Sequence, residues 1–140
     1  MTTEYTPESL EILNKLRDSV STNAKTKGFK NPPPGISAEV WFSKPLDVIR
    51  AAVYAANLHG EQSEMWEAAR DGKLHAPCDK AQKMTDKGLP ALTCVAEEIA
   101  DIIIRALDNA AEFDVDVAEA VSVKMAYNSG RAYKHGDKLA

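Results

Sequence analysis

Residues 90–113 have the sequence PALTCVAEEIADIIIRALDNAAEF, and this stretch decides the fold. A proline suits the start of a helix, because the first helical residue needs no backbone N–H. Apolar side chains then recur every three or four residues, which is the spacing of one helical face. They are Leu92, Val95, Ile99, Ile102, Ala106 and Ala110. Ile103, Ile104 and Leu107 widen this surface, so the helix is predicted to lie at the centre of a bundle or at a subunit interface.

Three more helices are predicted, over residues 7–22, 45–70 and 116–130. Thr6 and Ser43 are the candidate caps of the first two, Asp71-Gly72 ends the second, and Asp116 with Glu119 forms a capping box for the last. The expected core stripes are Leu10, Leu13, Leu16 and Val20 in the first helix and Leu46, Ile49 and Val53 in the second. The polar connection over residues 71–90 is expected to hold one short turn around residues 79–84.

No strand-like alternation is longer than four residues, so the predicted class is all-α with a four-helix-bundle-like core. One domain is expected over residues 1–140. Within it, residues 1–44 form the N-terminal helix and a linker, residues 45–134 the main helices, and residues 135–140 a tail. The linker contains Asn31-Pro32-Pro33-Pro34-Gly35, which cannot be helical and is expected to run extended.

Composition excludes several classes of protein. With 44% hydrophobic and 27% charged residues, the chain is predicted to be an ordinary globular protein rather than a disordered one. A net charge of −4 argues against a nucleic-acid partner held by a basic surface. Two cysteines are too few for a disulfide framework and are interpreted as reduced thiols. Since no signal peptide or membrane span is visible, we expect a cytoplasmic protein without a membrane partner.

Charge is distributed unevenly along the C-terminal half. Residues 97–119 hold eight acids against one base, and residues 124–140 hold four bases against one acid. An acidic wall followed by a basic tail is suited to a site that holds a metal ion and a polyanion together.

Two pairs of carboxylates indicate where that metal would lie. Glu61 and Glu64 are three residues apart on one predicted helix, and Glu98 and Asp101 are three apart on the next. Residues at this spacing share a helix face, and both pairs border a core stripe. If the helices pack antiparallel, four carboxylates converge, and their repulsion requires a cation such as Mg²⁺ or Mn²⁺.

Ordinary structural interpretations remain open beside this one. An E-x-x-E pattern is common on solvated helices, and Asp101 and Arg105 have the spacing of a simple salt bridge. Di-iron bundles use E-x-x-H, and none of the three histidines follows either pair at that spacing. Zinc is disfavoured because His and Cys do not cluster. The option that remains is Mg²⁺ acting on phosphate.

A basic face follows on the last predicted helix. Lys124, Asn128 and Arg131 recur at spacings of four and three, so they share one face. Lys and Arg there can contact phosphate oxygens. The alternative is a solvated last turn in which cations favour the helix C-terminus.

The motifs GEQSEMWEA (residues 60–68) and EEIADIIIRALDNAAEFDVDVAEAVSVKMAYNSGRAYKHG (residues 97–136) resemble the all-α NTP pyrophosphatases of the MazG-like superfamily. That pattern is E-x-x-E, then E-x-x-D, then K-x-x-x-N-x-x-R, and the resemblance covers about residues 45–136. Relatives in that superfamily include dimeric dUTPases, dCTP pyrophosphatases and phosphoribosyl-ATP pyrophosphatases.

The resemblance implies a Mg²⁺-dependent hydrolase that converts a nucleoside triphosphate to the monophosphate and pyrophosphate. The implied metal ligands are Glu61, Glu64, Glu98 and Asp101, with Glu61 or Glu64 as the catalytic proton acceptor. The implied substrate-binding residues are Lys124, Asn128 and Arg131, with Tyr127 and Trp41 as weaker candidates. The resemblance and the apolar helix over residues 90–113 both predict a homodimer or homotetramer. The alternatives are a phosphoribosyl-ATP pyrophosphatase and a non-catalytic helical interaction protein.

Overall fold

The computed structural model describes residues 5–131, and this part of the chain is all-α. Its helices are α1 (Glu11–Thr26), α2 (Ala38–Trp41), the 3₁₀ helix η1 (Lys44–Leu46), α3 (Asp47–Arg70), α4 (Ala81–Asp86), α5 (Cys94–Glu112) and α6 (Val117–Ser129). No strand occurs in the described residues, apart from one isolated β-bridge between Pro77 and Thr93. The predicted helical class is therefore confirmed.

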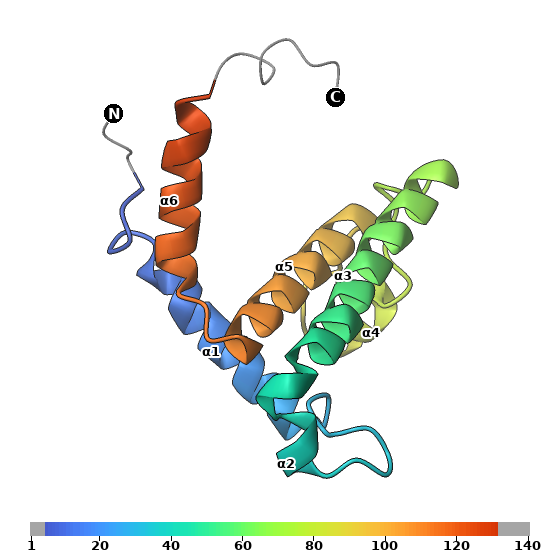
Figure 1. Ribbon diagram of the computed structural model, residues 1–140. Helices are drawn as coiled ribbons and strands as arrows, with labels where there is room; N and C mark the ends of the chain where they lie inside the picture. Colours follow the sequence, from blue (N-terminus) through green and yellow to red (C-terminus); the bar gives the residue numbers. More distant parts are fainter. Residues whose placement is uncertain (1–4, 132–140) are drawn as a thin grey trace.

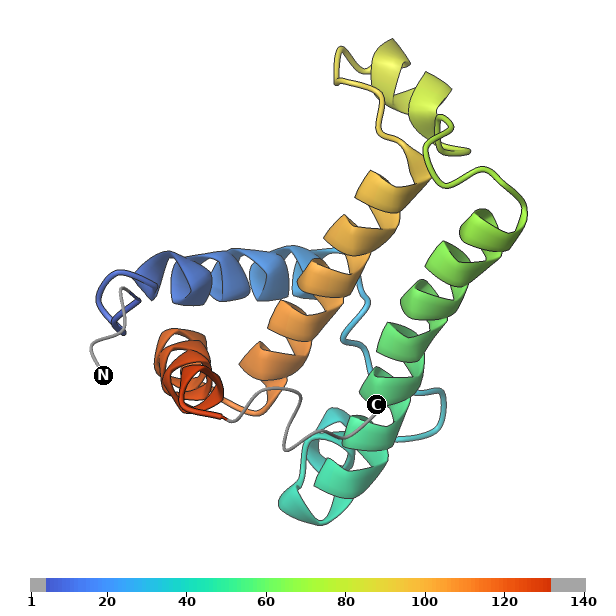
Figure 2. The same cartoon turned by 90° about the horizontal axis from the view of Figure 1, so that it is seen from above.

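The four long helices form an open series rather than a closed ring. Helix α5 packs against α3 on one side and α1 on the other, and α6 packs against α1 (Figure 1). Helices α3 and α5 run in opposite directions, as Figures 1 and 2 show. Helix α6 points away from α3, so the four long helices of residues 5–131 do not close the predicted four-helix bundle. The antiparallel α3–α5 pair is the part of the fold that positions the acidic residues.

Helix boundaries differ from the predicted ones where local hydrogen bonds compete. Thr6 and Ser9 cap each other, with each backbone N–H donating to the other's hydroxyl, so residues 7–10 form a turn and α1 begins at Glu11. Ser43 makes no capping hydrogen bond, and Pro45 lies in η1 instead of beginning α3. Helix α5 begins at Cys94, because the Thr93 hydroxyl accepts from Ala96 N–H.

Other boundaries are as predicted. Asp116 caps α6 through its carboxylate, which accepts from Glu119 N–H. Helix α3 ends at Arg70, and Gly72 follows with a φ of 67°, a left-handed conformation that favours glycine. The short helix α4 lies within the connection that was predicted to contain a turn.

The buried helix faces are more polar than the sequence predicts. Asn14, Ser21 and Ala24 are the buried residues of α1, and Arg50 and Glu61 are those of α3. The predicted stripes are wrong in part, since Leu16, Ile49, Val53 and Ile99 are exposed. Helix α3 turns its ion-pairing side chains towards α5, which leaves Ile49 and Val53 facing outwards. Among the helices of residues 5–131, none has the length and apolar composition of a membrane span.

Candidate metal centre

Three carboxylates from two helices converge between α3 and α5. Glu61 and Glu64 belong to α3 and Glu98 to α5, and one oxygen of each lies within 4.8 Å of the others. The convergence follows from the spacing of three on α3 and the antiparallel packing of α5 against it. We call these three residues the carboxylate cluster.

Glu98 is one of the two buried members of the carboxylate cluster, together with Glu61. Glu98 is only 9% exposed. Its Oε2 atom is buried and has no hydrogen-bond partner among the described residues. Burial, and after it the negative charges of Glu64 and Glu97, raise the pKa of Glu98 to about 7. A buried carboxylate oxygen without a partner is unfavourable, and a cation would satisfy it.

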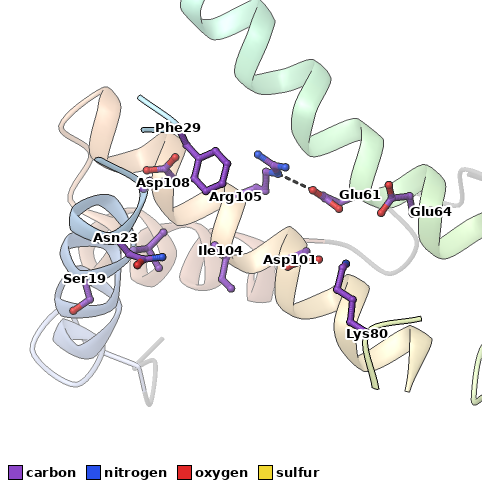
Figure 3. Close-up of a pocket in the computed structure, with 12 residues that line it drawn as sticks. Ser19, Asn23, Phe29, Glu61, Glu64, Lys80, Asp101, Ile104, Arg105 and Asp108 are labelled. Carbon is purple, nitrogen blue, oxygen red and sulfur yellow. Dashed lines mark hydrogen bonds and ion pairs between the residues drawn. The ribbon is translucent and has the colours of Figure 1, made fainter. Parts of the chain in front are cut away.

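Asp101 lies one turn further along α5 and faces the same space. It lines a cleft together with Glu61 and Glu64 (Figure 3). Its pKa is raised, first by burial and then by the negative charge of Glu61. Asp101 is outside the group of three, but it adds to the same negative potential. The chain thus places all four predicted acidic residues around one region.

The cleft has a volume of about 540 Å³ and lies between α1, α3 and α5. Volumes of this size are typical of small-molecule sites. Glu61, Glu64 and Asp101 are towards one end, while Ser19 and Asn23 of α1 are towards the other, where Phe29 lies beside a fourth lining carboxylate, Asp108 (Figure 3). Phe29 is 78% exposed, so its ring is accessible to a ligand in the cleft.

Two cations also line this cleft. Arg105 donates from Nε to Oε1 of Glu61 over 2.7 Å (Figure 3). The sequence also allowed a salt bridge between Asp101 and Arg105 within one helix. In the structure, Arg105 pairs instead with Glu61 of α3. Lys80, from the connection over residues 71–90, pairs with Glu97. That connection thus supplies part of the cleft wall.

The predicted substrate-binding residues lie away from the cleft in a single chain. None of Lys124, Tyr127, Asn128 and Arg131 lines it, because α6 is capped and held by α1 and extends away from α3 (Figure 1). Lys124 and Arg131 instead stack on the Tyr127 ring, at 4.8 and 5.8 Å from its centroid.

Trp41 is also absent from the cleft lining. It is 6% exposed in α2, and its carbonyl accepts a hydrogen bond from Arg50. Arg50 precedes Glu61 by eleven residues, which is about 16 Å along a helix axis. The aromatic side chain that does line the cleft is Phe29.

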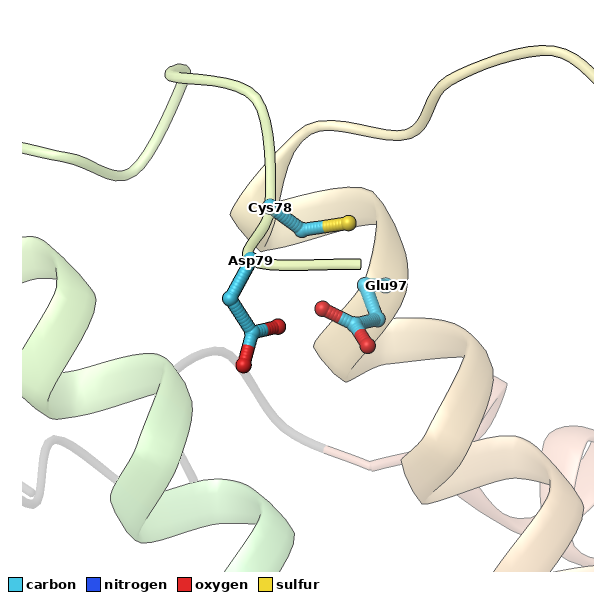
Figure 4. A group of neighbouring side chains, drawn as sticks. All are labelled: Cys78, Asp79 and Glu97. Carbon is cyan, nitrogen blue, oxygen red and sulfur yellow. The ribbon is translucent and has the colours of Figure 1, made fainter. Parts of the chain in front are cut away.

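A second group of possible ligands, Cys78, Asp79 and Glu97, surrounds the start of α5 (Figure 4). Glu97 is already paired with Lys80. Burial raises the pKa of the Cys78 thiol, which disfavours the thiolate that a metal needs. The carboxylate cluster is therefore the better candidate for a metal centre.

Several cleft residues were not identified from the sequence as site residues, among them Ser19, Asn23, Phe29, Lys80 and Arg105. Phe29 and Lys80 lie in loops, where periodicity gives no orientation. Arg105 carried one usable signal, because it follows Asp101 by four residues and therefore shares its helix face.

The donor set of the carboxylate cluster consists of hard oxygen ligands, which suits Mg²⁺ or Mn²⁺ better than softer metals. Its partly open position beside a cleft leaves room for a second ligand. No family model, curated protein or solved structure matches this chain.

Proposed function

We propose that this protein is a Mg²⁺-dependent nucleoside triphosphate pyrophosphohydrolase. The observation that carries the proposal is the buried Oε2 of Glu98, which lies beside Glu61 and Glu64 and has no hydrogen-bond partner within residues 5–131. Mn²⁺ would fit the same oxygen ligands. The double acidic motif and its resemblance to the MazG-like superfamily support the same activity.

In the proposed reaction, a water oxygen bonds to the α-phosphorus and the bond from that phosphorus to the bridging oxygen breaks. The products are the nucleoside monophosphate and pyrophosphate. A divalent ion, when bound, would neutralise the negative charge that develops on the phosphates. Glu64 is exposed and lines the cleft, whereas Glu61 is buried, so Glu64 is the better-placed acceptor for the proton of water.

The other end of the cleft is suited to a nucleoside. The exposed ring of Phe29 offers a stacking surface for a base, and such stacking tolerates any base. Asn23 and Ser19 offer polar groups to the base edge or the sugar. Asn23 and Phe29 therefore replace Trp41 as the residues proposed to bind the nucleoside.

A homodimer or homotetramer is part of this proposal. No large side chain in residues 5–131 is completely buried, which is unusual for a chain of this length. Val48 is 70% exposed on α3, and Ile49 and Val53 are exposed beside it. Apolar surface of this kind favours self-association. Sedimentation is expected to show a species larger than the 15.3 kDa chain, and a monomer at micromolar concentration would contradict this.

Substitution of the acidic residues tests the activity. Glu98→Gln and Asp101→Asn should abolish Mg²⁺-dependent pyrophosphate release, because each removes a negative charge from the proposed metal centre. Glu67→Gln is the matched control, since Glu67 is exposed on α3 and does not line the cleft. The substrates should cover ribo- and deoxyribonucleoside triphosphates and phosphoribosyl-ATP, which separates the two enzymatic alternatives. Full activity of either variant on every substrate would refute the assignment.

Thermal melting separates the enzyme from a non-catalytic interaction protein. A ligand that binds only the native state raises the melting temperature. Millimolar Mg²⁺ or Mn²⁺ should therefore raise Tm for the wild type and have little effect on Glu98→Gln. The absence of a shift with either ion would favour the interaction protein.

A further inference from the structure

Arg105 differs from Arg50, which also joins α3 to α5, in how its donors are used. Arg50 is buried, and its guanidinium is engaged by Trp41 and Ser43 carbonyls and by Asp47 and Glu112 carboxylates. It therefore has a structural role.

Arg105, in contrast, is partly exposed on the wall of the cleft. It uses Nε for Glu61, and within residues 5–131 its two Nη groups donate no hydrogen bond. A guanidinium has five N–H donors, and the terminal pair suits two oxygens of one phosphate. Most of the binding capacity of Arg105 is thus unused and available to the cleft.

The Arg105 contact also involves the same carboxylate that belongs to the carboxylate cluster. Glu61 Oε1 accepts from Arg105, and Glu61 is one of the three residues whose oxygens lie within 4.8 Å of one another. A divalent ion on the cluster and the guanidinium therefore compete for the charge of Glu61. In the absence of such an ion, Arg105 is the cation that partly compensates the cluster.

We propose that Arg105 is a phosphate-binding residue of the cleft and that Glu61 binds it until a metal ion and phosphate ligand arrive. When Glu61 ligates a divalent ion, Arg105 turns its free donors to the phosphates of the incoming ligand. This inference rests on the proposed function, and it adds a residue to which neither the sequence motifs nor the resemblance assigned a role.

The proposal predicts two effects of opposite sign when Arg105 loses its charge. Affinity for the metal alone rises, because a competing positive charge next to the cluster disappears. Affinity for a metal-bound polyphosphate falls, because its phosphates lose a charged, two-pronged donor. An arginine that merely joined α5 to α3 would shift both affinities in one direction or neither.

The experiment uses Arg105→Met, which keeps an apolar stem for packing against the helices. Mn²⁺ alone and the preformed Mn²⁺ complex of inorganic tripolyphosphate are titrated calorimetrically into the full-length protein. Tripolyphosphate carries no base or sugar, so the result does not depend on nucleoside preference. We expect Mn²⁺ to bind about three- to tenfold more tightly and the complex about tenfold more weakly.

Two further variants complete the set. Arg105→Lys retains the charge but not the two-pronged geometry, so Mn²⁺ affinity should remain near the wild-type value while the complex binds a few-fold more weakly. Arg70→Ala, on the exposed end of α3, should match the wild type in both titrations. Circular dichroism spectra establish that each variant folds, and Arg105→Lys provides the test if Arg105→Met does not.

The outcomes separate this inference from the proposed function. If the wild type binds neither Mn²⁺ nor the complex, the proposed function itself fails. If the wild type binds both, but Arg105→Met leaves the two affinities unchanged or moves them in the same direction, only the role of Arg105 is overturned.

Discussion

Asn14 of α1 holds the N-terminus of α6 by hydrogen bonds in both directions. Its Nδ2 donates to Asp116 Oδ1 over 2.9 Å, and its Oδ1 accepts from Val117 N–H over 2.8 Å. Asp116 is itself the cap of α6. One buried amide thus joins two helices whose sequences lie about a hundred residues apart.

Asn14→Ala should consequently destabilise the protein. It removes a buried amide and leaves the Asp116 carboxylate and the first N–H groups of α6 with fewer partners. We expect the free energy of unfolding to fall by about 2–3 kcal/mol. Urea denaturation measures this value. Asn23→Ala, an exposed asparagine of the same helix, is the control and should change it by less than about 0.5 kcal/mol.

A second prediction concerns a largely buried ion network at the cleft wall, which Asp108 helps to line. Lys30 Nζ lies 3.1 Å from Asp108 Oδ1 and 3.2 Å from Glu112 Oε2, and Arg50 Nε lies 3.0 Å from Glu112 Oε1. Lys30→Met removes one partner and leaves buried negative charge, so unfolding should become easier by about 3 kcal/mol.

Lys27→Met is the matched control for this network, because Lys27 is exposed in the same segment. Chemical denaturation should give a clearly lower free energy of unfolding for Lys30→Met than for Lys27→Met. Since Phe29 adjoins Lys30, the Lys30 variant should also bind nucleotides more weakly. Equal stability of the two variants would show that the network contributes little.

Phe29→Ala should separate the two ends of the cleft. Under the proposed function, it raises KM for a nucleoside triphosphate about tenfold, because stacking on a base contributes roughly 1–3 kcal/mol. The binding of Mn²⁺–tripolyphosphate should not change, since that ligand has no base. Steady-state kinetics and calorimetry provide the two measurements, and a parallel loss of both would contradict a role confined to the nucleoside.

The pKa of Glu98 predicts how the stability of the metal-free protein depends on pH. This pKa is raised from 4.5 to about 7, so the folded state binds the proton more tightly than the unfolded chain. The stabilisation is fully present below pH 4.5 and is lost as the pH rises through about 7. The loss should be on the order of 2 kcal/mol, allowing for water that enters the cleft.

Denaturation of wild type and Glu98→Gln in a chelator, between pH 5 and pH 8, measures this loss. The variant should lack this part of the pH dependence and be the more stable protein at pH 8. Identical profiles would mean that Glu98 titrates near its usual value. Stabilisation by Mn²⁺ should increase over the same range for the wild type, since the ion competes with the proton.

Local sequence rules predicted which segments are helical and where several of them end. Asp116 with Glu119 and the Asp71-Gly72 pair act through neighbours in the chain, and the structure contains both signals at the predicted positions. Thr6 was predicted to cap the first helix. It instead forms reciprocal hydrogen bonds with Ser9, which make a separate turn before α1. Propensity could not decide between that turn and an earlier start of the helix.

The sequence also placed Glu61 with Glu64 and Glu98 with Asp101 on common helix faces, because helical spacing is fixed by backbone geometry. Only the tertiary structure decided that α5 lies antiparallel to α3, that Arg105 pairs with Glu61, and that Phe29 reaches the cleft. It also turned the polar face of α3, with Arg50, inwards. These outcomes depend on packing and charge compensation between residues far apart in the chain, and no local pattern contains that information.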